Sequence, residues 1–497
     1  MTNLFSEEKK RTLFFLIICL SFYIIPILMA DRYFIDDLGR SARGYYGGSS
    51  NGRPMADLVM FIIGLGGLNV DLSPLPMITA IIIFSLSAVY FSKTIKNDGS
   101  LCYAILLPLG IIINPFMLEN LSYKYDVLPM TMSVSAILIA YSGFKNKKIN
   151  YACGVALSLF SLMCYQASIG LFVSFAVFEF ISKSYNNSIE KKPLRECFFI
   201  LLSRALQLIT ALIIYKLLIS MFFPQDVSDY AKMHSEIISL NSEGYTVFIN
   251  NFYNFSEIIF NYVSSMPDLI FYSMELLTLL SLILIIKKVC NLKSPLAILS
   301  SLLIIASPII FYIFSIIHLL ILKHPVLEPR VLISFSAITL MPFYLSAIHM
   351  RFKNFSKLLL LLFVAFSYTY IYAYGNALKS VKSYEDYVSM SISNDIKSID
   401  PQARLLLQTS GFMDYPPQAM LTIEKYPSIK KLLPRYLNNN WSWAFHQLRK
   451  FGIKNNPAWI SGDKVKDLKN MNSIVNRNDY EISSNKEVLL IRLKGKN

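Results

Sequence analysis

The sequence predicts a polytopic α-helical membrane protein with about 11 spanning helices, followed by a small α/β domain outside the membrane. Three observations lead to this fold class. The 497-residue chain is 54% hydrophobic and 16% charged, with a mean hydropathy of +0.47, whereas soluble proteins are about 25% charged. Apolar runs recur through the first three quarters of the chain, and residues 375–497 contain no such run. Six cysteines in so long an apolar chain exclude disordered and disulfide-scaffold classes.

A helix needs about 20 mostly apolar residues to cross a bilayer. The runs that meet or approach this length lie near residues 12–30, 75–92, 101–116, 127–144, 151–164, 167–182, 198–223, 268–286, 296–317, 331–349 and 357–374. Three of these runs, at 101–116, 151–164 and 167–182, are short. The apolar stretch 55–68 is interpreted as a short helix that lies against the outer face.

Lysine and arginine predict the orientation, because the short loops on the cytoplasmic side are enriched in them. With Met1 on the cytoplasmic side, the inner segments carry 18 basic residues and the outer loops carry 8. The formal charge of +15 therefore indicates topology, and we expect no nucleic-acid partner. The predicted membrane domain is 1–374, with outer loops at 31–57, 114–126, 224–267 and 318–330, and an odd number of spans places 375–497 outside.

Within that outer domain, the pattern predicts a mixed α/β structure. We expect a helix over 383–399, a strand over 404–408, a helical stretch interrupted by prolines over 418–433, and a final strand over 487–493.

The first outer loop carries two adjacent carboxylates, Asp36 and Asp37, only a few residues beyond the first span. Low polarity and a neighbouring like charge raise a carboxyl pKa, which suits a general base that acts on a hydroxyl group. The alternative is a solvated acidic loop that forms ion pairs with the nearby arginines.

The same loop contains Tyr45 among glycines, and the arginines Arg40 and Arg53. A tyrosine ring can stack on a sugar face, and a guanidinium group can bind a phosphate through two hydrogen bonds. The alternative is an interfacial aromatic belt in which the arginines only anchor the chain.

The second outer loop places Tyr123 and Lys124 between the carboxylates Glu119 and Asp126. The carboxylates are candidates for binding sugar hydroxyls or a divalent ion, Tyr123 is a candidate for binding a sugar, and Lys124 is a candidate for binding phosphate. The alternative is an ordinary polar start of a helix. Because no His/Cys cluster or dense carboxylate set accompanies them, we predict no metal cofactor.

Three further positions are candidates. Gln166, between two short spans, offers an amide to a sugar, or it packs in the bundle. Arg330 precedes a span, where it neutralises a lipid-linked phosphate or anchors the helix. In the tail, Trp441 and Trp443 either stack on an acceptor sugar or belong to the core of the small domain. The chain has no P-loop, GxGxxG, GxSxG or HExxH motif.

A span, a loop with an acidic pair, many further spans and an outer C-terminal domain together resemble the GT-C class of membrane glycosyltransferases. More narrowly, the motifs resemble the serotype-converting O-antigen glucosyltransferases of bacteriophages and prophages of Gram-negative bacteria. The motifs are Asp31-Arg32-Tyr33 with Asp36-Asp37-x-x-Arg40, Gly52-Arg53-Pro54, Glu119-Asn120-Leu121-Ser122-Tyr123 and Tyr165-Gln166. The layout resembles that family over the whole chain, whereas the motifs lie in its first third.

This resemblance implies a multi-pass enzyme of the bacterial inner membrane, with a cytoplasmic N-terminus and a periplasmic active site and C-terminus. The implied donor is undecaprenyl phosphate-glucose, and the implied acceptor is a repeat unit of lipid-linked O-antigen, whose modification causes serotype conversion. A donor synthase and a flippase are further expected partners.

The mechanism implied by the resemblance is inverting. Asp36 or Asp37 is the base, Arg40, Arg53 or Arg330 neutralises the leaving phosphate, and a metal is dispensable.

A different class of function remains as the alternative, namely an O-antigen polymerase or a lipid-linked oligosaccharide transporter. A transporter places charges and broken helices at the middle of the membrane. Here most charges lie at the outer edge of the predicted spans, which favours an enzyme.

Overall fold

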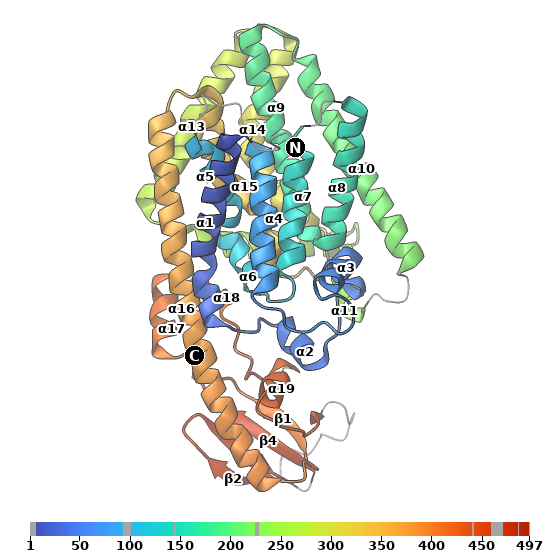
Figure 1. Ribbon diagram of the computed structural model, residues 1–497, viewed down its shortest axis with the longest axis vertical. Coiled ribbons are helices and arrows are strands. Elements are labelled where there is room, and N and C mark those ends of the chain that lie inside the picture. Colours follow the sequence, from blue (N-terminus) through green and yellow to red (C-terminus); the bar gives the residue numbers. More distant parts are fainter. Residues whose placement is uncertain are drawn as a thin grey trace. The chain divides into compact units, whose positions relative to one another are not determined.

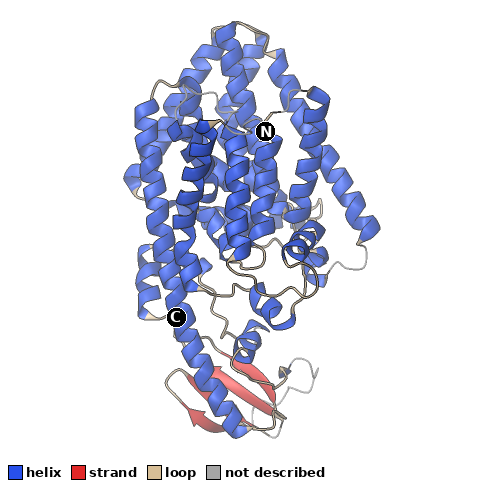
Figure 2. Cartoon of the chain, in the orientation of Figure 1, coloured by secondary structure: helices blue, strands red, loops and turns tan. Residues whose placement is uncertain are grey.

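The computed structural model describes residues 6–92, 101–143, 146–223, 228–439, 442–458, 471–485 and 487–496. Helices dominate this part of the chain, and its strands form one sheet near the C-terminus (Figure 2). The chain divides into two compact units. The helical unit comprises Met1–Ile25, Tyr46–Gly67 and Leu72–Ile371, and the sheet unit comprises Pro26–Tyr45, Leu68–Asp71 and Tyr372–Asn497.

The described part of the helical unit consists mainly of helices. Its longer helices are α1 (Glu7–Ala30, which continues into the sheet unit), α3 (Pro54–Ile63), α4 (Leu75–Phe91), α5 (Leu101–Ile112), α7 (Val127–Ala140), α8 (Lys147–Cys164), α9 (Ile169–Glu190), α10 (Arg195–Phe222), α12 (Ser242–Val263), α13 (Asp268–Cys290), α14 (Pro295–Leu320), α15 (Ser336–His349) and the first half of α16 (Lys353–Ile399). Its short helical turns are η1 (Ser49–Asn51), η3 (Pro115–Met117), α6 (Leu118–Ser122), η4 (Gln166–Ser168), α11 (Asp229–Met233) and η5 (Pro329–Phe335).

Seven of the described helices are long and apolar enough to cross a membrane, or eight if a pair bent by 49° at residues 113–114 counts as one span. All the predicted apolar runs do form helices, but the expected number of spans is not confirmed. Helices α4 and α7 have 17 and 14 residues, and at about 1.5 Å per residue they are shorter than the ~30 Å hydrocarbon layer. Helix α8 begins with two lysines and is not among the seven.

Helix α7 lies at the centre of one group of helices and is buried along almost its whole length. It packs against α4 and α8 (Figure 1). Serines such as Ser133 and Ser135 lie on it without exposing polar atoms, because their hydroxyls donate to backbone carbonyls of the preceding turn. Small residues of this kind let neighbouring helices approach closely.

Helix α12 lies in a segment that the sequence analysis assigned to an outer loop. Its N-terminus is capped by Asn241, whose side chain accepts a hydrogen bond from the Gly244 N–H. Phe255, Ile259 and Tyr262 form a buried stripe at a spacing of three to four residues, and the helix packs against α14. Its polar residues interrupt the apolar run, which is why hydropathy alone did not detect it.

The sheet unit is organised around the second half of α16 and a four-stranded sheet. Its remaining elements are α2 (Asp36–Arg43), β1 (Leu406–Ser410), α17 (Pro417–Lys425), α18 (Ile429–Leu432), α19 (Ser442–Arg449), β2 (Asn472–Asn476), β3 (Tyr480–Ser484) and β4 (Val488–Leu493). The strand order is β1-β4-β3-β2, with β1 parallel to β4 and the other pairs antiparallel. Val388, Ile392 and Ile396 of α16 recur at helical spacing and belong to the buried core with β1, β3 and β4.

Most of the elements expected after residue 375 are present. Helix 383–399 is the end of α16, strand 404–408 is β1, the stretch 418–433 forms α17 and α18, and the last strand is β4. The chain of α16 continues through Gly375, so that the expected last span and the following helix are one 47-residue helix. Strands β2 and β3 and helix α19 were not expected, because their polar residues show no clear alternation.

The sheet unit also contains residues 26–45 and 68–71. The sequence analysis had placed both segments in the membrane domain, before residue 374. The acidic loop therefore packs with the C-terminal segment of the chain.

Candidate functional site

In the helical unit, Arg53 is held by two neighbouring residues between α8 and α9. Its Nε donates a 2.6 Å hydrogen bond to Oε1 of Gln166, and its guanidinium carbon lies 4.6 Å from the centre of the Tyr165 ring. Among the described residues, none accepts a hydrogen bond from Nη1 or Nη2 of Arg53.

The side-chain amide of Gln166 also fixes the backbone immediately before Arg53. Nε2 of Gln166 donates to the carbonyls of Asn51 and Gly52 and to the Tyr215 hydroxyl, which in turn donates to the Gly52 carbonyl. Gly52 has φ +70°, and a Cβ atom there would lie 2.7 Å from the Tyr215 hydroxyl oxygen. The glycine is thus required both by the backbone angle and by the close approach of the tyrosine.

Asp57 organises the turn that precedes this segment. Its Oδ1 accepts from the Gly48 N–H at 2.7 Å, and its Oδ2 accepts from the N–H and the hydroxyl of Ser49 at 2.6 Å. The sequence analysis did not select Asp57 or Tyr215. The sequence could have indicated Asp57, because it is the one acidic residue just after the Gly52-Arg53-Pro54 triplet.

Glu119 and Arg330 form a buried ion pair in the same unit. The two oxygens of Glu119 accept from the Nη1 and the backbone N–H of Arg330, both at 2.7 Å, and the Glu119 side chain is 1% exposed. Nη1 of Arg330 also donates to the Tyr123 hydroxyl at 2.9 Å. The carbonyl of Arg330 accepts from the Tyr165 hydroxyl at 3.0 Å, which connects this pair to the ring beneath Arg53.

The structure thus gathers five of the predicted residues into one cluster, which we call the arginine cluster. Its members are Arg53, Glu119, Tyr123, Gln166 and Arg330, joined through Tyr165. Lys124 and Asp126 lie in the same unit, half-buried in the turn between α6 and α7. Among the described residues, no group of three or more His, Cys, Asp or Glu side chains is arranged to hold a metal ion.

In the sheet unit, the two adjacent aspartates begin helix α2 but differ in exposure. Asp37 is fully buried, and its Oδ2 accepts from the Phe34 N–H at 3.0 Å. Asp36 is half-buried. Both carboxylates lie in the first turn of α2, where the partial positive charge of the backbone N–H groups favours an anion.

Two of the remaining predicted residues of the sheet unit, Tyr45 and Trp443, lie against Gly39 of α2. A Cβ atom at Gly39 would lie 2.9 Å from the Tyr45 hydroxyl and 3.2 Å from the Trp443 ring, so these two aromatic side chains meet over this glycine. Arg40 is buried. Trp441 lies outside the described residues.

Beside Trp443, the imidazole of His446 is kept neutral by its surroundings. Its ring centre is 5.4 Å from that of Trp443. Burial, together with the charges of Arg43 and Arg449, lowers the pKa of His446 to about 4.

Comparison with known proteins agrees with the resemblance carried by the motifs. Residues 25–341 match the model of the family described as glucosyl transferase GtrII. A protein of Salmonella phage P22, named an uncharacterized 55.3 kDa protein in the gtrB 5' region, is 28% identical to this chain over 486 residues, which are 95% of this chain and 96% of the phage protein. No solved structure matches the chain. Because the family match covers more than half of its length, the chain belongs to the glucosyl transferase GtrII family.

Proposed function

We propose that this protein transfers glucose from undecaprenyl phosphate-glucose to a repeat unit of lipid-linked O-antigen, on the periplasmic side of the bacterial inner membrane. Family membership supports the glucosyl transfer. The observation that carries the choice of donor is Arg53, whose two terminal nitrogens are available in a segment fixed by Gln166 and Gly52. A guanidinium group presented in this way suits a phosphate.

In the proposed reaction, the hydroxyl oxygen of the acceptor sugar attacks the anomeric carbon of glucose. The bond between that carbon and the phosphate oxygen breaks, and undecaprenyl phosphate leaves with the electron pair, so that the configuration at the anomeric carbon is inverted. Arg53 stabilises the charge that develops on the phosphate. The charge of Arg330 is balanced by Glu119, which favours Arg53 as the phosphate ligand.

The base that takes the proton from the acceptor hydroxyl is Asp36. A general base must come within hydrogen-bonding distance of the proton that it removes. Asp36 is half-buried, whereas Asp37 has no exposed surface and accepts a hydrogen bond within its own loop. Asp37 therefore stabilises the loop, and Asp36 carries out the chemistry. Tyr45 and Trp443 offer aromatic faces on which the acceptor sugars stack.

The test is the mass of the O-antigen repeat unit in a host that supplies the acceptor, the donor synthase and the flippase. In cells that carry the full chain, each modified repeat unit should gain the mass of one hexosyl residue, that is, one hexose less one water. Asp36→Asn should insert in the membrane at the wild-type level and abolish the gain, because loss of a general base lowers the rate by about 10²- to 10⁴-fold. Asp37→Asn should retain activity at reduced stability.

Asp31→Asn is the matched control, because Asp31 belongs to the same loop and its side chain is 64% exposed. Full activity of Asp36→Asn, or loss of activity in Asp31→Asn, would show that the base is assigned to the wrong residue. An unchanged repeat-unit mass with an altered chain length would contradict the glucosyl transfer itself and favour a polymerase. Accumulation of unmodified lipid-linked units on one side of the membrane would favour a transporter.

A further inference from the structure

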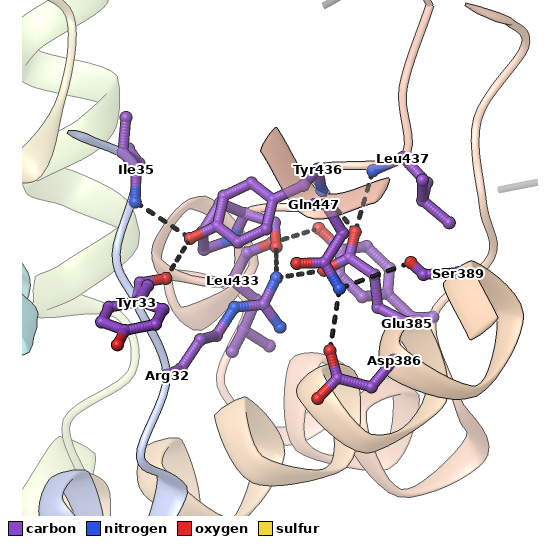
Figure 3. A network of polar contacts seen from close by, with 12 residues as sticks. Arg32, Tyr33, Ile35, Glu385, Asp386, Ser389, Leu433, Tyr436, Leu437 and Gln447 are labelled. Atoms are coloured by element: carbon purple, nitrogen blue, oxygen red, sulfur yellow. Dashed lines mark hydrogen bonds and ion pairs between the residues drawn. The ribbon is translucent and has the colours of Figure 1, made fainter. Parts of the chain in front are cut away.

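Tyr436 bridges the two peptide groups on either side of Phe34, two residues before Asp36. Its hydroxyl donates to the Tyr33 carbonyl at 2.7 Å and accepts from the Ile35 N–H at 2.9 Å (Figure 3). The Tyr436 side chain is buried, and this burial raises the pKa of its hydroxyl to about 12, so the group remains a donor at neutral pH. One side chain from the C-terminal segment thus sets the backbone that leads into the acidic pair.

Glu385 holds this tyrosine and the start of the acidic loop together. Its Oε1 accepts from the backbone N–H groups of Tyr436 and Leu437, at 2.5 and 2.9 Å. Its Oε2 accepts from Nη2 of Arg32 at 2.6 Å, in an ion pair whose side chains are 3% and 1% exposed. The Arg32 guanidinium also lies over the Tyr436 ring, 4.5 Å from its centre (Figure 3). The three side chains form one buried unit.

The loop needs such support because its backbone is strained. Ile35 has a φ of 46°, a positive value that residues other than glycine, asparagine, aspartate and histidine rarely adopt. Ile35 is β-branched, for which a positive φ is a strong outlier. Strained residues persist where surrounding contacts over-determine them, and they cluster at functional sites. The bridge from Tyr436 joins the Tyr33 carbonyl to the N–H of the strained Ile35, the residue before Asp36.

We propose that Tyr436 and Glu385 are positioning residues of the glucosyl transfer, which hold the backbone of residues 32–35 and thereby aim the Asp36 carboxylate at the acceptor hydroxyl. This inference rests on the proposed role of Asp36 as the base. Both residues lie beyond the range 25–341 that matches the family model. The segment after residue 341 therefore contributes to the geometry of a loop near the start of the chain.

The test compares Tyr436→Phe with Tyr480→Phe in the full chain, in membranes supplied with undecaprenyl phosphate-glucose and lipid-linked O-antigen. Tyr436→Phe removes the two hydrogen bonds and keeps the ring beneath Arg32. Tyr480→Phe is the matched control, because Tyr480 is similarly buried in the same unit and its hydroxyl donates to the Asp395 carboxylate at 2.6 Å, away from the acidic loop. Asp36→Asn and the double variant Asp36→Asn/Tyr436→Phe complete the set.

We expect Tyr436→Phe to lower kcat by about 10- to 100-fold, because a displacement of a reacting group by about 1 Å has effects of this size. The KM for the donor should change less than about twofold, since the donor phosphate is assigned to Arg53. Tyr480→Phe should keep the wild-type kcat, with a thermal unfolding temperature close to that of Tyr436→Phe. The double variant should be no slower than Asp36→Asn alone, because Tyr436 acts through Asp36.

Two results would overturn the positioning role while the proposed function stands. One is a wild-type kcat in Tyr436→Phe when Asp36→Asn is inactive. The other is a multiplicative loss in the double variant, which would indicate that Tyr436 acts independently of Asp36. Full activity of Asp36→Asn would instead overturn the base assignment, whatever Tyr436→Phe does.

Glu385→Gln provides a second variant for the same proposal. It keeps an oxygen for the two backbone N–H groups and removes the charge that holds Arg32, so kcat should fall while the donor KM stays the same. An unchanged kcat in this variant would contradict the role of Glu385.

Discussion

Nε of Arg53 donates a 2.6 Å hydrogen bond to Oε1 of Gln166, 113 residues further along the chain. The same amide fixes the backbone of Asn51 and Gly52 through its nitrogen. Gln166 therefore orients both the guanidinium group and the turn that carries it. The two motifs, Gly52-Arg53-Pro54 and Tyr165-Gln166, are thus joined directly by hydrogen bonds.

Arg53→Lys should weaken use of the donor. A lysine keeps the positive charge but lacks the planar fork that binds a phosphate through two hydrogen bonds and lies flat on Tyr165. Hydrogen bonds to charged groups contribute about 1.5–3 kcal/mol, so kcat/KM for the donor should fall by about 10- to 100-fold. Initial rates at varied donor concentration measure this, with Arg195→Lys at the start of α10 as the matched control. Equal losses in both variants would argue against a specific phosphate contact.

Gly52→Ala should lower activity through the geometry of its neighbours. The alanine would adopt φ +70°, and its Cβ would lie 2.7 Å from the Tyr215 hydroxyl oxygen, which displaces both Tyr215 and Gln166. A left-handed alanine costs about 1–2 kcal/mol, and the added contact increases that cost. Gly143→Ala is the control, because Gly143 has φ +76° with no atom within 4 Å of the added Cβ. If both variants lose the same activity, the close approach of Tyr215 has no functional role.

Glu119→Gln should destabilise the helical unit. Removal of one partner of a buried ion pair leaves an uncompensated charge and costs about 3–5 kcal/mol, and the Arg330 and Glu119 side chains are 17% and 1% exposed. Thermal unfolding of Glu119→Gln, Arg330→Gln and the double variant gives the coupling between them. The double variant should lose less stability than the two single variants added together. Strict additivity would mean that the pair is not coupled.

His446 should make the stability of the sheet unit depend on pH. Its pKa in the folded chain is lowered to about 4 by burial and by two arginines, from an ordinary value of 6.5. The unfolded chain therefore binds more protons between these two pH values, and stability should fall as the pH falls from 6.5 towards 4.

His446→Gln should remove this part of the pH dependence, which unfolding of the full chain at pH 7, 5.5 and 4.5 would measure. His324→Gln, at an exposed position, is the control. An unchanged pH profile in His446→Gln would assign the dependence to other groups.

The sequence alone predicted most of the helices and most of the candidate site residues, because both depend mainly on the local sequence. An apolar run is removed from water, so its backbone N–H and C=O groups must bond to each other, and a helix provides these bonds within the run. Every predicted run accordingly appears as a helix in the structure. Hydropathy does not set the exact length of each helix, and α4 and α7 are shorter than a span. Helix α12 was missed because polar residues interrupt its apolar run, although Phe255, Ile259 and Tyr262 form a buried stripe in the folded chain.

The roles within the site could be predicted only in part. Glu119 was a candidate for binding sugar or an ion, and the structure shows that it carries the counter-charge of Arg330, 211 residues away. Tyr215 lies in an apolar helix, where nothing in the local sequence marks its contact with Gly52. Glu385 and Tyr436 were not selected, since their partners Arg32, Tyr33 and Ile35 lie some 350 to 400 residues earlier.

The sequence by itself determined that this is a helical, apolar chain with an acidic pair after its first helix, and its motifs identified the glucosyltransferase family. These properties reside in hydropathy and in short motifs, which depend on neighbouring residues only. The tertiary structure decided which of the two aspartates keeps an exposed surface, which arginine keeps available nitrogens, and which distant residues hold both groups. Burial and hydrogen bonding between segments hundreds of residues apart arise only when the chain folds, because they depend on which side chains come together in space.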